Sequence, residues 1–232
     1  MNTINEIWQT QIRLLTFRNV RPDLKNRFSA YLFYILFVTW LAGVGRYWDH
    51  PRAETWQCLG LGSLVYIFVL SLFLWIIILP LKPQNWTYSA VLVFVGLTAL
   101  PALLYAVPVE RFMDLAHAQK TNAVFLGIVA AWRVALYVKF LYSSAKLSIF
   151  RIIVATLLPL TAIVFVLSCL NLEHVVFEIM AGIREPDKSP HDTAYIIIFA
   201  LGMLSSVTFP VTFILYLIAI TASRFDTADE KT

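Results

Sequence analysis

The chain has 232 residues, 59% of them hydrophobic and 14% charged, with a mean hydropathy of +0.74 and a net charge of +4. So few polar side chains cannot cover the surface of a soluble globule of this size. The composition therefore excludes a soluble domain and predicts an integral membrane protein.

The predicted fold is all-α, a polytopic integral membrane protein with six transmembrane helices and an N-terminal amphipathic interfacial helix. The apolar runs are continuous rather than alternating, and each is long enough to cross a hydrocarbon core of about 30 Å as a helix. The predicted parts are a basic segment (1–27), a transmembrane domain (28–222) and a polar tail (223–232). The predicted spans are 28–44, 58–79, 87–107, 122–141, 150–171 and 193–222.

The first 27 residues form an amphipathic, basic segment rather than a signal peptide. Ile4, Trp8 and Ile12 recur at helical spacing, and Thr3 with Glu6 makes a capping box. Five Lys and Arg side chains then lead into the first span, which predicts a helix lying on the membrane surface. A helix packed against the rest of the protein fits the same pattern.

The charges in the connections predict the orientation. The termini and the second and fourth connections hold 11 Lys and Arg residues, against 6 in the other three connections. Because cytoplasmic loops carry the excess of positive charge, both termini are predicted to be cytoplasmic.

Three spans carry an interior proline with a threonine shortly before it: Pro101, Pro159 and Pro210. Each proline frees a backbone carbonyl about one turn earlier. A threonine hydroxyl or a donor on a neighbouring helix can satisfy that carbonyl, so the kinks are candidate binding features. Kinking without a binding function is the simpler interpretation.

Arg133 is the one charged residue in the interior of the fourth span. An arginine at this depth needs a partner, and we expect carbonyls near Pro159 or the hydroxyls of Thr156 and Thr161 to supply it. Since no acidic residue lies inside a predicted span, the arginine is expected to be structural or to face an anion. The predicted polar core comprises Arg133, Thr156, Thr161, Pro159, Pro101 and Pro210.

Two rows of small residues at four-residue spacing predict close helix packing. The row in the fourth span lies nearly opposite Arg133, because residues two positions apart sit about 200° around a helix. This makes 120–141 a two-sided helix and the predicted centre of the bundle. The rows are Ala123, Gly127, Ala131 and Ala135 in the fourth span, and Gly202 and Ser206 in the sixth.

No tight metal-ligand spacing and no nucleotide-binding or nucleophile motif occurs in the sequence, so we expect no metal, no cofactor and no enzyme activity. The four histidines (50, 117, 174, 191) fall in connections, where His117 follows Asp114. Cys58 and Cys169 both lie near the predicted outer helix ends, so they can pair or act as buried apolar fillers. Residues 172–185 predict an outer amphipathic helix.

Three stretches carry a resemblance to a known family: LPALLYAVPVERF, AAWRVALYVKF and VATLLPLTAIVFVLSCLNLEHVVFEIM. They resemble bacterial multi-span proteins related to the Yip (Rab-interacting) membrane family. The resemblance implies a small helical membrane protein linked to membrane trafficking or organisation through partners. Six spans depart from the five spans usual for that family.

The sequence thus favours a non-enzymatic protein of the bacterial inner membrane that acts through helix-helix or partner association. The expected partners are the lipid bilayer and a second copy or another membrane protein, with no nucleic acid. The alternative is a small transporter or channel for an anion or polar solute, built around Arg133 and the proline-kinked helices.

Overall fold

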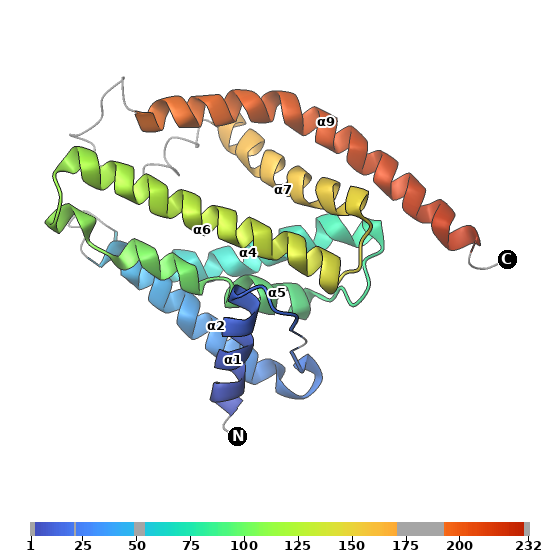
Figure 1. Cartoon of the computed structure of the whole chain (residues 1–232), viewed down its shortest axis with the longest axis horizontal. Coiled ribbons are helices and arrows are strands. Elements are labelled where there is room, and N and C mark those ends of the chain that lie inside the picture. The colour runs from blue at the N-terminus through green and yellow to red at the C-terminus, as the bar shows by residue number, and fades with distance from the viewer. Residues whose placement is uncertain (1–2, 21, 49–53, 171–192, 230–232) are drawn as a thin grey trace.

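The computed structural model describes residues 3–20, 22–48, 54–170 and 193–229 (Figure 1). Every regular element in these residues is helical, which confirms the predicted all-α class. The elements are α1 (Thr3–Leu15), α2 (Leu24–Tyr47), α3 (Thr55–Cys58), α4 (Leu61–Ile78), η1 (Leu79–Leu81), α5 (Tyr88–Leu97), η2 (Leu100–Ala106), η3 (Val109–Arg111), α6 (Leu115–Ser143), α7 (Ile149–Cys169) and α9 (Thr193–Asp229).

Six helical segments are long and apolar enough to cross a membrane, as predicted. The amphipathic helix expected over 172–185 lies outside the described residues. The observed spans are Leu24–Tyr47, Leu61–Leu81, Tyr88–Ala106, Lys120–Ser143, Ile149–Cys169 and Ala200–Ser223.

Polar caps and prolines explain where several spans begin and end. Asp23, Thr87 and Asp114 each accept the backbone N–H three residues further on, at 3.4, 3.2 and 3.0 Å, and so start α2, α5 and α6. Pro80 and Pro101 stand in the 3₁₀ turns η1 and η2 that follow α4 and α5. These local signals set the helix bounds before any packing is considered.

The centre of the bundle is α5, and the prediction that α6 occupies it is wrong. All residues from Val91 to Leu97 are buried, and 56% of the α5 span is buried against 22% of the α6 span. The approach of α2 is so close that a Cβ atom on Gly96 would lie 2.5 Å from Cβ of Ile35. The charge of Arg133 does not show that α6 is buried, because the burial of a span depends on how many helices surround it.

α7 and α9 run side by side as an antiparallel pair along one side of the bundle (Figure 1). The hydroxyls of Thr161 and Thr212 share a hydrogen bond of 3.0 Å between these helices. Gly202 permits the close approach, since a Cβ atom there would lie 2.9 Å from Oγ of Ser168. Tyr216 ties the pair to the bundle by donating its hydroxyl to a carbonyl of α4 at 2.7 Å.

The N-terminal helix α1 runs across the long helices instead of beside them (Figure 1). Ile7, Gln11 and Leu15 form a buried row against the bundle. Ile4 and Trp8, on a neighbouring face, are 67% and 45% exposed. The helix therefore docks on the protein, as the alternative interpretation held, and leaves Ile4 and Trp8 exposed.

One end of the bundle gathers the starts of α2, α5 and α7 and the ends of α4, α6 and α9 (Figure 1). We call it the basic end, because Arg18, Lys25, Lys139 and Lys146 lie there. A backbone hydrogen bond of 2.9 Å from Gln84 to the carbonyl of Ala145 joins two of its connections.

Candidate functional site

Arg133 lies half-buried on α6 and faces aromatic rings of α4 and η2. Its Cζ atom is 5.7 Å from the ring centroid of Tyr66. Arg46 at the end of α2 lies 4.7 Å over the ring of Tyr105, whose hydroxyl interacts electrostatically with both arginines. The electron-rich ring faces attract the guanidinium groups, so aromatic rings take the place of a carboxylate partner.

The partners predicted for Arg133 lie elsewhere. Thr161 donates to the carbonyl of Leu157 at 2.9 Å in its own helix and also contacts α9. The Oγ1 atom of Thr156 is buried, and among the described residues it has no hydrogen-bond partner. The expected site between Arg133 and α7 is therefore not assembled, because α6 turns its arginine toward α4 and η2.

The carbonyl freed by Pro101 is satisfied by a side chain of α1. This carbonyl belongs to Leu97, four residues earlier, and accepts a hydrogen bond of 2.8 Å from Nε2 of Gln11. Oε1 of Gln11 accepts in turn from the hydroxyl of Tyr34 on α2. Gln11 is fully buried and was not among the predicted site residues. Gln11 lies one helical turn from Ile7 and one turn from Leu15, and this spacing in the sequence could have placed it on the buried face of α1.

The carbonyl freed by Pro159 is satisfied by a side chain of α6. It belongs to Ala155 and accepts a hydrogen bond of 3.3 Å from the hydroxyl of Tyr137. Both proline sites thus follow the prediction that a neighbouring helix supplies the donor. The donors are Gln11 near Pro101 and Tyr137 near Pro159, where Arg133 was the expected partner. Pro210 lies on an exposed face of α9 and does not join this core.

The two small-residue rows have different surroundings. Gly202 packs against Ser168 of α7, and the Ser206 hydroxyl binds the Gly202 carbonyl at 2.9 Å. On α6, a Cβ atom on Gly127 would meet no atom within 4 Å, and Ala131 and Ala135 are exposed. Only Ala123 of that row is half-buried. In the sixth span Gly202 packs inside the chain and Ser206 is exposed, while the α6 row faces outward at Gly127, Ala131 and Ala135.

A cavity of about 750 Å³ lies at the basic end, between α1, the connection to α2, the start of α5 and the end of α6. We call it the basic cavity. Near it, α1 meets α6 through a hydrogen bond of 3.0 Å from Nε1 of Trp132 to the carbonyl of Leu15, two residues that do not line the cavity. That contact lies 11 residues before the end of α6, which is about 16 Å along the helix. The sequence alone did not indicate this cavity.

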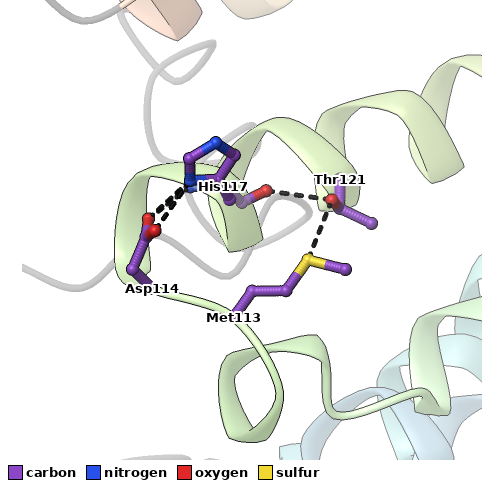
Figure 2. A network of polar contacts seen from close by, with 4 residues as sticks. All are labelled: Met113, Asp114, His117 and Thr121. Carbon is purple, nitrogen blue, oxygen red and sulfur yellow. Dashed lines mark hydrogen bonds and ion pairs between the residues drawn. The ribbon is translucent and has the colours of Figure 1, made fainter.

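Asp114 and His117 at the start of α6 form a local polar network (Figure 2). The Asp114 carboxylate accepts the backbone N–H of His117 at 3.0 Å and lies 2.7 Å from its ring Nδ1. Thr121 donates to the His117 carbonyl and to the sulfur of Met113, at 2.9 and 3.5 Å. These contacts cap the helix. The described residues contain no group of three His, Cys, Asp or Glu side chains placed to hold a metal ion.

Cys58 and Cys169 are both exposed and are not joined by a disulfide. Neither prediction for them, pairing or burial, therefore describes the structure.

Comparisons with protein-family models, curated proteins and solved structures find no match to this chain.

Proposed function

We propose that the protein is a non-enzymatic, multi-pass protein of a bacterial inner membrane that works by associating with a second copy of itself. The outward face of α6 is the observation that carries this proposal. An organising role through association is also what the Yip resemblance implies. In the proposed orientation the basic end faces the cytoplasm, so both termini lie on the cytoplasmic side.

The α6 face suits a close helix contact. Gly127, Ala131 and Ala135 leave the backbone accessible over two turns, while Val124 and Ile128 beside them are 57% and 48% exposed. Small residues flanked by branched ones allow the backbones of membrane helices to approach closely. Gly202 on α9 supports this view, because this chain already uses a glycine to bring two helices close together.

Disulfide crosslinking in membranes tests the proposal. In a chain with Cys58 and Cys169 replaced by serine, Gly127→Cys should give a crosslinked dimer under mild oxidation. Val69→Cys is the matched control, because Val69 is 60% exposed on α4 and lies on no small-residue row. Equal crosslinking at both positions, or none at Gly127→Cys, would contradict association through α6.

A second candidate, the transport of an anion or polar solute, is favoured by the basic cavity. Its positive rim and its position between helices are features of a solute site. Anion-dependent flux in vesicles that contain the protein, lost on Lys139→Gln, would support transport over association alone. Flux that Lys139→Gln leaves unchanged would argue against the cavity as the route.

A further inference from the structure

We propose that the basic cavity binds the phosphate-bearing headgroup of an anionic membrane lipid. The proposal does not rest on self-association through α6, because it is argued from the residues that line the cavity, and Gly127, Ala131 and Ala135 are not among them.

The charge around the cavity is strongly one-sided. Arg18, Lys25, Lys139 and Lys146 line it, and Asp23 is the one carboxylate among its described lining residues. That carboxylate is already used at the start of α2, where its Oδ2 atom accepts from the Asn26 side chain at 2.9 Å. No ion pair joins the four cations to a carboxylate in the part of the chain that the structure describes. The rim therefore attracts an anion.

The cavity also has an apolar wall. Four apolar residues are among those that line it, Leu14 of α1, Val93 and Phe94 of α5, and Leu136 of α6, and the last three are buried. Its volume of about 750 Å³ falls within the roughly 300–1,000 Å³ typical of sites for organic ligands. A bare inorganic anion would leave most of this space and the apolar wall without contacts. The fitting ligand is an anion with an apolar part.

The position of α1 favours a lipid over a soluble amphiphile. Ile4, Trp8 and Ile12 on α1 are 67%, 45% and 39% exposed, so this helix presents an apolar edge suited to hydrocarbon. Thr10 and Leu14, on another face of α1, line the cavity toward the basic end. The cavity thus lies where headgroups meet acyl chains, and basic pockets between membrane helices bind phospholipid headgroups there.

Hydroxyl and amide side chains complete the fit to a phosphate. Asn85, Thr87 and Ser89 at the start of α5 and Ser144 at the end of α6 line the cavity, as does Ser143, whose hydroxyl donates to the Lys139 carbonyl at 2.8 Å. Such donors hydrogen-bond phosphate oxygens, and nearby lysine and arginine side chains balance the charge.

Lipid-dependent thermal stability of the purified full-length protein tests the proposal. Short-chain phosphatidylglycerol should raise the melting temperature with saturation, whereas phosphatidylcholine of equal chain length and inorganic phosphate should have little effect. Each of Arg18→Gln and Lys146→Gln should weaken the phosphatidylglycerol response about fivefold, since each removes one basic residue from the rim.

Lys82→Gln is the matched control. Lys82 and Lys146 are both exposed lysines at the basic end with positive φ, 53° and 50°, but only Lys146 lines the cavity. An equal response to phosphatidylcholine would overturn the proposal. So would a response to inorganic phosphate alone, which would indicate a free-anion site, or an equal loss in Lys82→Gln and Lys146→Gln.

Discussion

Two stretches with the same Thr-x-x-Pro pattern, 98–101 and 156–159, have different structures. The helix α5 ends at Leu97 and Pro101 lies in the 3₁₀ helix η2 that follows, whereas α7 continues through Pro159. A proline removes the same backbone hydrogen bond in both places. The surrounding helices therefore decide whether the helix changes its geometry.

The polar groups near the two prolines also differ in how well they are satisfied. Thr98 donates its hydroxyl to the Val95 carbonyl at 2.8 Å, while the buried hydroxyl of Thr156 has no partner among the described residues. The freed carbonyl near Pro101 accepts at 2.8 Å and the one near Pro159 at 3.3 Å. The Pro101 site is the better satisfied, because α1 brings a buried amide to it.

The largest change in the free energy of unfolding is expected at the Pro101 site. Gln11→Leu should lower the free energy of unfolding by about 2–4 kcal/mol, because the Leu97 carbonyl and the Tyr34 hydroxyl both lose a buried partner. Titration with a denaturing detergent in mixed micelles measures this change. Gln9→Leu, at an exposed position on the same helix, should change stability by no more than about 0.5 kcal/mol. Equal effects of the two changes would contradict the bridging role of Gln11.

A smaller effect is expected at the Pro159 site. Tyr137→Phe should lower the free energy of unfolding by about 1 kcal/mol, since it removes the longer hydrogen bond to Ala155 without opening a cavity. Tyr142→Phe, on the same helix with Tyr142 67% exposed, is the control and should leave stability unchanged. A loss from Tyr137→Phe as large as that from Gln11→Leu would mean that the two proline sites are equally well satisfied.

The smallest change in the free energy of unfolding is expected at Thr156, where the substitution should raise it instead of lowering it. Thr156→Val should leave stability unchanged or raise it by up to about 1 kcal/mol, because it removes a buried hydroxyl that has no described partner. Thr98→Val should lower stability by about 1 kcal/mol, because it removes the bond to Val95. The same unfolding measurement compares the pair. A destabilising Thr156→Val would show that its hydroxyl is hydrogen-bonded in the bilayer.

Arg133 and the small-residue rows show how much of the candidate site can be predicted from the sequence. The need of Arg133 for protein neighbours followed from its place in an apolar span, but its contact with Tyr66 did not. The rows at Gly127 and Gly202 look alike in sequence, yet only Gly202 packs inside the chain. A residue pattern along one helix indicates which contacts that helix can make. Which of those contacts forms depends on how the neighbouring helices are placed and oriented around it.

The sequence by itself determined the all-helical class, the six spans and the need to satisfy the proline-freed carbonyls. These properties are local, because apolar length sets whether a helix crosses the membrane and a missing N–H affects only the preceding turn. The tertiary structure decided that Gln11 and Tyr137 supply the donors, that α5 lies at the centre, and that α1 closes a basic cavity. Those features join residues far apart in the chain, such as Gln11 and Leu97, which are 86 positions apart, so they arise only when the helices pack.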